Sequence, residues 1–303
     1  MKSKRNYIFR VAICMIVFLC IIQSSLYAKE FSGLETENVS VYSEKSNDIT
    51  VRQVIELYPA VKAELETKLN WKVDFKPAVL LVSDRKMFAE MAGSPLIVAY
   101  AVPEKMLIVI DYTRMHTEPF TLAATLEHEL CHLLLHRYIH ADQLPRWLDE
   151  GVCQWVSGGL AEIVTGSKES ALGWASLSGG FIPFNALSAN FPEDERSLAL
   201  AYGESRSVVE YIVSNFGKSG LLNILDAMKN GHDVYDAVSM SLGMSLGELE
   251  KKWQGSQRSW TSVISVLVAN LYTILFAFGA FLTLAVYIRL IIRKRRLRDV
   301  EED

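Results

Sequence analysis

Cysteine is scarce in this sequence, with four residues in a chain of 303. Two of the four fall within the first 28 residues, which leaves Cys131 and Cys153 for the rest of the chain. Two cysteines cannot build a disulfide framework, so the small disulfide-rich classes of secreted protein are excluded. A single bridge between Cys131 and Cys153 stays open, beside the simpler alternative that both are small side chains packed between helices.

A basic surface is also missing from the centre of the chain. Residues 29–262 contain 21 Lys and Arg against 31 Asp and Glu, a net charge of −10, whereas the whole chain carries −4. Nucleic acids are bound largely through basic side chains, so this balance argues against a nucleic-acid partner and favours basic or neutral substrates. No internal repeat is visible, and the length of this region is sufficient to bury a core.

Charge is absent from residues 263–288, a run of 26 residues that can cross about 30 Å of hydrocarbon. Only Asn270 and scattered hydroxyl groups interrupt its apolar character, so we expect a transmembrane helix. Six basic residues follow in residues 289–298. Because basic residues collect on the cytoplasmic side of a membrane, residues 289–303 are expected to form a basic cytoplasmic tail.

The first 28 residues have the pattern of a secretory signal. Basic residues among the first ten precede an apolar run over residues 11–22, and Ala28 could lie just before a cleavage site. An uncleaved anchor is the alternative. Both ends of the chain therefore predict the same topology, in which residues 29–262 lie outside the cytoplasm, in the periplasm or at the cell surface, tethered by one C-terminal span.

The region between these segments reads as α+β. Apolar runs predict strands at 39–42, 78–82, 96–102 and 106–111, with the last two paired. Helical spacing predicts a helix over residues 50–69 that breaks at Pro59, and Asp84 is placed to cap a helix through residue 91. After Ser157 the chain becomes rich in Gly and Ser, which predicts loops. Four further helices are expected at 198–215, 218–229, 234–241 and 246–253.

The strongest motif is His128-Glu129-Leu130-Cys131-His132, an H-E-x-x-H pattern within a predicted helix over residues 120–140. Residues four apart lie on one face of a helix, so both imidazoles can point at one zinc ion. Glu129 lies about 100° around the helix from His128, where it can act on a water at the metal. Catalytic zinc takes three protein ligands and keeps one open position, so a third ligand is needed.

Glu150 is the best third ligand. His136 lies about 12 Å from His128 along one helix axis, too far to share an ion. The position six residues after His132, where another class of zinc peptidase has its third histidine, is Tyr138. Pro145 suits a helix start, and the helical spacing of residues 146–156 lets Glu150 face back across a short loop.

Two histidines on one helix and a glutamate on the next, within Trp147-Leu148-Asp149-Glu150-Gly151, resemble the gluzincin metallopeptidases and more narrowly the peptidase-MA-like group. The resemblance implies a zincin-like fold, with a small mixed sheet and an active-site helix followed by an all-helical lobe. It also implies that residues 97–101 form an edge strand that holds a peptide substrate by main-chain pairing. An ordinary hairpin within the core sheet is the alternative for this segment.

The same resemblance suggests roles for residues outside the zinc ligands. Tyr202, in Ala201-Tyr202-Gly203-Glu204-Ser205, would stabilise the oxyanion, although an aromatic residue packed under the site is the simpler interpretation. Arg206 and His232 are weaker candidates for that role. Some gluzincins have an Asp four residues after the glutamate ligand, and this chain has Gln154 there. Asp149, Asp142 or a backbone carbonyl could orient the zinc histidines instead. The other histidines, His116, His136 and His140, are interpreted as incidental, with the alternative that His136, one turn beyond the site, contacts a group that orients the zinc ligands.

Two functions fit this pattern. The first is a membrane-anchored zinc peptidase acting on peptides outside the cytoplasm, with Glu129 as general base. The second is a catalytically silent binding or assembly protein that retains a zinc-containing gluzincin scaffold. Because Glu129 contributes nothing to metal binding, its presence favours the enzyme.

Overall fold

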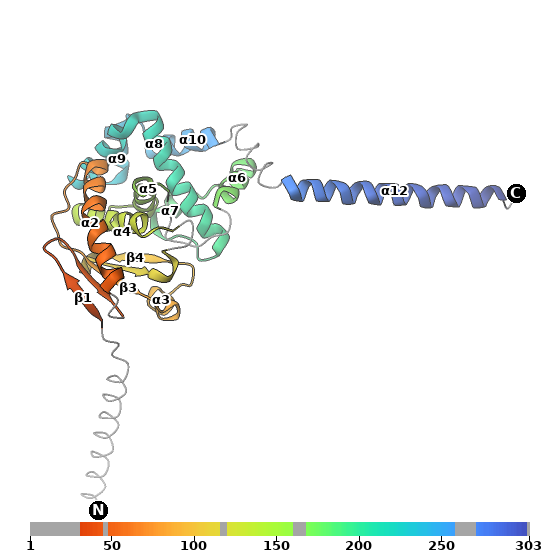
Figure 1. Cartoon of the computed structure of the whole chain (residues 1–303). Helices are drawn as coiled ribbons and strands as arrows, with labels where there is room; N and C mark the ends of the chain where they lie inside the picture. The colour runs from red at the N-terminus through yellow and green to blue at the C-terminus, as the bar shows by residue number, and fades with distance from the viewer. Residues whose placement is uncertain (1–30, 45–47, 116–119, 160–167, 258–270, 302–303) are drawn as a thin grey trace, which may run out of the picture. The chain divides into compact units, whose positions relative to one another are not determined.

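The computed structural model describes residues 31–44, 48–115, 120–159, 168–257 and 271–301 (Figure 1). The chain divides into two compact units, residues 1–133 and 134–303, and the boundary falls inside the continuous helix α4 (Leu122–Tyr138). The predicted signal at residues 1–28 lies outside the described residues.

The first unit is built on a five-stranded mixed sheet in the order β1-β2-β3-β5-β4. Its strands are β1 (Ser32–Glu35), β2 (Ser40–Ser43), β3 (Ala78–Val82), β4 (Ala99–Val102) and β5 (Leu107–Asp111). The pairs β2–β3 and β3–β5 are parallel, whereas β1–β2 and β4–β5 are antiparallel. Among the described strands β4 pairs only with β5, so it forms one edge of the sheet, as the resemblance implied for residues 97–101, although β4 begins only at Ala99.

The core of this unit lies on both faces of the sheet, because successive apolar residues of a strand point to opposite faces. Phe88 of α3 (Arg85–Ala92) packs against Val82 and Val109 on one face. On the other face, α2 (Asp48–Leu69) and the first half of α4 cover the strands (Figure 1). Because both faces are covered, β3 and β5 are nearly continuous apolar runs, which made them easy to predict.

Three local predictions for this unit can be compared with the structure. Asp84 caps α3, accepting hydrogen bonds from the backbone N–H groups of Lys86 and Met87 at 3.0 and 3.2 Å. The predicted break at Pro59 is wrong, because α2 continues through it from Asp48 to Leu69. Strand β1 was not predicted, since Ser32–Glu35 is exposed along its length and carries no apolar alternation.

The second unit is helical. It contains the end of α4 together with α5 (Arg146–Val156), α6 (Lys168–Ser178), α7 (Phe184–Ala189), α8 (Glu195–Lys229), α9 (Val234–Leu242) and α10 (Leu246–Gln257). Gly217 has φ 72° and ψ 170° inside α8, so α8 is two helices joined at a kink, as the sequence predicted. The loop prediction for the Gly- and Ser-rich stretch is partly wrong, since α6 and α7 lie within it.

Aromatic side chains form the core of the helical unit. Trp147 is fully buried and stacks on Phe184 with ring centroids 5.0 Å apart. Phe184 and Phe181 both contact Trp253, whose indole N–H donates to Ser207 Oγ at 3.1 Å. This cluster joins α5, α7, α8 and α10 and so fixes the helix that carries Glu150.

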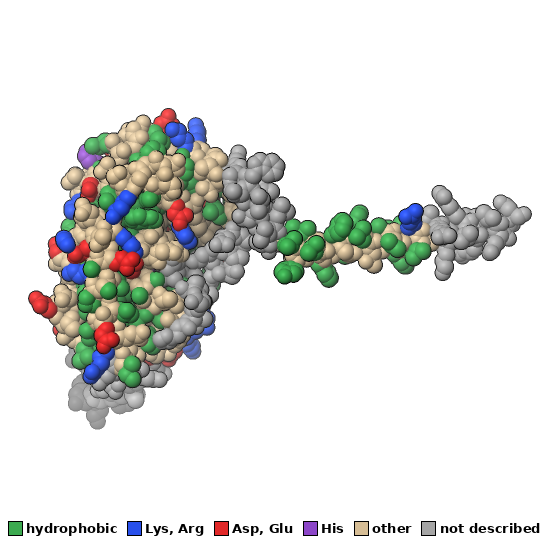
Figure 2. Space-filling view, turned by 45° about the horizontal axis from the view of Figure 1, so that its top comes forward, with side chains coloured by type: hydrophobic (Ala, Val, Ile, Leu, Met, Phe, Trp, Pro, Cys, Tyr) green, Lys and Arg blue, Asp and Glu red, His purple; other side chains and the backbone are tan. Residues whose placement is uncertain are grey.

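Helix α12 (Leu271–Glu301) contains the one stretch among the described residues, Leu271–Ile291, that is long and apolar enough to cross a membrane. The predicted span over residues 263–288 thus overlaps it, although residues 263–270 lie outside the described part of the chain. Hydrophobic side chains are exposed along the part of this helix whose side chains the structure describes (Figure 2).

Candidate metal centre

Helix α4 carries ionisable groups in an unusually apolar setting. Its leucines from Leu126 to Leu135 are fully buried, and so are His128 and Glu129, while His132 is only 6% exposed. Burying such groups is unfavourable unless they are paired or bind a metal, and proteins tolerate that cost mostly at functional sites. The middle of α4 is therefore a candidate functional site.

The two histidines of the motif point toward one another. Their Nε2 atoms lie 3.2 Å apart, with ring centroids at 4.9 Å and ring planes at 76°. Two imidazoles on one tetrahedral zinc, each with a Zn–N bond of about 2.0–2.1 Å, would place these atoms about 3.3 Å apart. A hydrogen bond between the two rings would give a similar separation, so the third group decides between the interpretations.

Glu150 is that third group. It lies in the first half of α5, which starts directly after Pro145, and its side chain is only 6% exposed. One ligand atom from each of His128, His132 and Glu150 lies within 4.8 Å of the other two. Two imidazole nitrogens and a carboxylate oxygen are a donor set that suits zinc and leaves a coordination position open. The residues present therefore fit the metal that the sequence predicted.

Close contact between α5 and α8 holds the turn that carries Glu150. A Cβ atom at Gly151 would lie 2.4 Å from the backbone oxygen of Ser205, so only glycine permits this approach. One turn further along α5, Gln154 Nε2 donates to the backbone oxygen of Tyr202 at 3.0 Å. Gln154, which departs from the pattern of some gluzincins, thus ties α5 to α8.

Tyr202 is buried and is connected to Glu150 only through two other side chains, those of Phe191 and Arg146. Its ring meets Phe191 edge-on, with centroids 5.2 Å apart and planes at 83°. The guanidinium of Arg146 lies 4.7 Å from the centre of the Phe191 ring, and Arg146 Nε is 3.8 Å from Glu150 Oε1. These contacts give Tyr202 a packing role and place it two side chains from the proposed ligand.

His136, which the sequence suggested to be incidental, has a defined partner. Its Nε2 lies 2.9 Å from Asp149 Oδ2, with both side chains largely buried. Ligand-type atoms of His132, Asp149 and Cys153 also lie within 4.8 Å of one another. Among the alternatives for orienting the histidines, the structure favours Asp149. His140 is exposed, and His116 lies outside the described residues.

The cysteines and the weaker candidates occupy other surroundings. Cys131 and Cys153 are both buried, and they form no disulfide bridge. Arg206 pairs with Glu210 on α8, with Arg206 Nε 2.7 Å from Glu210 Oε1, while His232 follows the end of α8.

Glu204 is a buried carboxyl group that sequence reasoning did not single out. It is fully buried in α8 and accepts hydrogen bonds from the backbone N–H of Ile182 at 3.2 Å. Desolvation raises the pKa of Glu204 to about 8, and the nearby charge of Glu250 adds to the rise. Helical spacing could have shown that Glu204 is buried, because it lies three residues after Ala201 and four before Val208, on the buried face of the helix.

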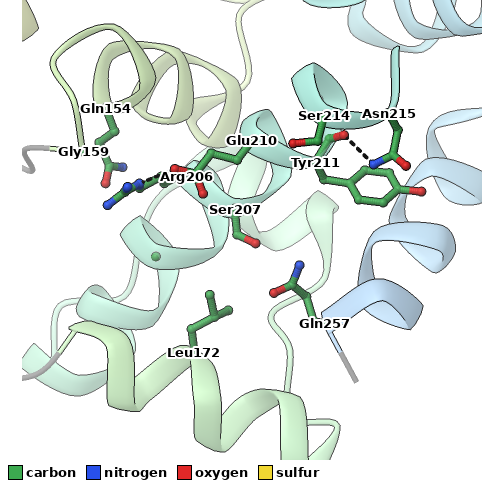
Figure 3. A pocket seen from close by; sticks show the side chains of 11 residues that line it. Gln154, Gly159, Leu172, Arg206, Ser207, Glu210, Tyr211, Ser214, Asn215 and Gln257 are labelled. Atoms are coloured by element: carbon green, nitrogen blue, oxygen red, sulfur yellow. Dashed lines mark hydrogen bonds and ion pairs between the residues drawn. The ribbon is translucent and has the colours of Figure 1, made fainter. Parts of the chain in front are cut away.

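A cavity of about 480 Å³ lies beside α8, between α6 and α10 (Figure 3). Its walls carry Gln154, Gly159, Leu172, Gly203, Arg206, Ser207, Glu210, Tyr211, Ser214, Asn215 and Gln257. None of the five predicted site residues lines it, so this cavity is separate from the candidate metal centre.

Comparison with known proteins gives a family and distant structural likenesses. Residues 97–259, more than half of the chain, match the model of the Peptidase MA superfamily. Among solved structures, yeast LTA4 hydrolase in complex with bestatin is similar at 14% identity and TM-score 0.44, over 76% of this chain and 38% of that one. An M1 zinc metallopeptidase from Deinococcus radiodurans is similar at 13% identity and TM-score 0.42, over 76% of this chain and 52% of that one. This chain thus spans about half or less of either protein. No curated protein matches the sequence.

Proposed function

The chain belongs to the Peptidase MA superfamily, and on that premise we propose that it is a zinc-dependent metallopeptidase. His128, His132 and Glu150 would hold the metal, and Glu129 would move the proton. The observation that supports this most directly is the convergence of two buried imidazoles and one buried carboxylate, with ligand atoms within 4.8 Å of one another.

Zinc, when bound, supplies Lewis acidity that makes water more acidic and polarises the carbonyl of the scissile peptide bond. The chain supplies the rest. Neutral imidazoles at His128 and His132 and a carboxylate at Glu150 fix the metal and leave one position open. Glu129, next to His128 on α4, accepts a proton from the attacking water at its carboxylate and transfers it to the leaving amine nitrogen.

Substrate would be held on the first unit of the chain. We propose that β4 (Ala99–Val102) pairs with an extended peptide, because among the described strands it is an edge strand that pairs only with β5. Main-chain pairing recognises peptides with little regard to side chains, which suits a general peptidase.

Tyr202 is our candidate for stabilising the oxyanion that forms as the carbonyl is attacked. Its support is its place on α8, two side chains from Glu150. The Tyr202→Phe variant removes only the hydroxyl, so we expect the turnover number to fall by roughly 10²-fold, with KM little changed. An unchanged turnover number would leave Tyr202 with its packing role alone.

We also propose the topology that the ends of the chain predict. Residues 29–262 would lie outside the cytoplasm, residues 263–288 would span the membrane, and residues 289–303 would lie in the cytoplasm. The support is the length and apolar surface of Leu271–Ile291, together with the basic residues that follow it in the sequence.

Substitution of Glu129 tests the peptidase proposal. Glu129→Gln keeps the side-chain shape but cannot accept a proton, so we expect peptide cleavage to fall by roughly 10³-fold or more. Zinc content should stay near that of the wild type, since Glu129 is not a ligand. Cleavage at the wild-type rate in this variant would refute the proposal and would favour a binding or assembly protein on the same scaffold.

A further inference from the structure

His136 and Asp149 form a pair that the metal site, as proposed so far, does not use. The imidazole Nε2 and carboxylate Oδ2 atoms are 2.9 Å apart, and the side chains are 20% and 14% exposed. A contact this short and this sheltered from water is stronger than an exposed ion pair. It joins the last turn of α4 to the first turns of α5.

The spacing of residues along α4 sets the position of His136 relative to the two proposed histidine ligands. His128, His132 and His136 follow one another at intervals of four, so each lies about 6 Å further along the helix and about 40° around it. His136 therefore cannot reach the metal of His128, but it is one turn beyond His132. A partner of His136 is held at a fixed height relative to the two proposed ligands.

The position of Asp149 on α5 links the pair to Glu150. Asp149 directly precedes Glu150, and adjacent helical residues differ by about 1.5 Å in height and 100° in direction. Once Asp149 is held by His136, both the height and the rotation of α5 are set at Glu150. A slip of α5 by one turn would break the pair and would carry Glu150 about 5.4 Å along its axis.

Asp149 also has surroundings that suit this role. Its Oδ1 lies 3.9 Å from Cys153 Sγ one turn along α5, and its carboxylate belongs to the group that includes a ring nitrogen of His132. Gln154, which replaces the expected carboxylate on α5, donates instead to the Tyr202 backbone oxygen. Asp149 is thus the carboxylate of α5 that lies next to the proposed ligands without being one of them.

We propose that His136 and Asp149 act as a positioning clamp, which sets Glu150 relative to the histidines of α4 and so raises the affinity of the site for zinc. This inference rests on the proposed zinc site. In this proposal neither residue binds the metal or the substrate, so both are positioning residues. Outer partners of metal ligands typically change metal affinity by about 10–100-fold, which sets the size of the expected effect.

The test measures zinc affinity by chelator competition on the full chain in detergent. His136→Ala should weaken zinc binding by about 10–100-fold, and Asp149→Asn should weaken it in the same range. His136→Gln keeps a hydrogen-bond donor and should recover part of the loss. His140→Ala, at an exposed residue just after the same helix, is the matched control and should bind zinc as the wild type does.

A second readout separates positioning from general damage. The cobalt-substituted protein reports ligand geometry through its visible absorption, which should change in His136→Ala and partly return in His136→Gln. If His136→Ala does not fold, Asp149→Asn and His136→Gln still carry the test. Zinc affinity and cobalt spectra equal to those of the His140→Ala control would overturn the clamp. A wild-type chain that binds no zinc would instead refute the proposed function itself.

Discussion

Helices α4 and α12 are both rich in apolar residues, yet their side chains end in opposite environments. In α4 the leucines and the central polar groups are buried together. In α12 the apolar side chains are exposed, with Tyr272 at 88% and Phe276 at 82%. The comparison teaches that apolar composition alone does not say where a helix lies. Polar groups inside α4 indicate a site, whereas the exposed apolar side chains of Leu271–Ile291 are what the proposed membrane span requires.

The largest expected effect comes from placing charge in α12, which tests whether this helix spans a membrane. The double substitution Phe278→Lys and Phe281→Lys places two charges near the centre of the proposed span, at a cost of roughly 5–7 kcal/mol for insertion. We expect a C-terminal tag that is protected in intact cells to become accessible to protease added outside. The matched control changes both residues to Leu and should keep the tag protected. Equal protection in both variants would contradict a membrane-spanning α12.

The next largest effect concerns the buried site on the α4 side. Glu150→Ala removes one of three proposed ligands. Because the binding free energy of a protein-held zinc is about 10–16 kcal/mol, the loss of one ligand should weaken zinc binding by roughly 3–5 kcal/mol. Zinc affinity measured by chelator competition should fall by about 10³-fold. Glu193→Ala, at an exposed position before α8, is the control. Undiminished zinc affinity in Glu150→Ala would mean that the third ligand lies elsewhere.

An effect of similar size is expected at Glu204, a buried carboxyl group that does not belong to the proposed metal site. Because the pKa of Glu204 is raised to about 8, the folded state holds its proton more tightly than the unfolded state does. The wild type should therefore lose stability as pH rises from about 4.5 to about 8, and little more above that. Glu204→Gln should remove this loss, which is on the order of 5 kcal/mol.

Chemical denaturation of wild type and variant across that pH range checks this prediction. The stability gained by Glu204→Gln should grow with pH and level off near pH 8. A difference that does not vary with pH would show that the pKa of Glu204 is the same in the folded and unfolded states.

Local patterns were enough to predict much of this structure. The apolar runs of β3 and β5, the Asp84 cap and the kink at Gly217 follow from rules that act over a few residues. Strand β1 could not be found in this way, because Ser32–Glu35 is polar and exposed and is recognisable only through its pairing with β2. Pro59 was misjudged because the packing of α2 on the sheet maintains the helix despite the missing donor.

The candidate site shows the same division. The H-E-x-x-H spacing and the Glu150 context identify residues that the structure brings together, because a helix fixes which side chains share a face. The contact between His136 and Asp149 and the burial of Glu204 depend on how helices pack, so single-sequence patterns gave little sign of them. Gln154 was identified as a departure, but its bond to Tyr202 required the structure.

X-ray absorption at the zinc edge of the purified, zinc-loaded chain tests the central claim most directly. The account predicts a first shell of nitrogen and oxygen only, at about 2.0–2.1 Å, with scattering from two imidazole rings. A sulfur neighbour at about 2.3 Å would contradict it, because the metal would then lie at the cysteine side of His132, in the group with Asp149 and Cys153, and not at Glu150.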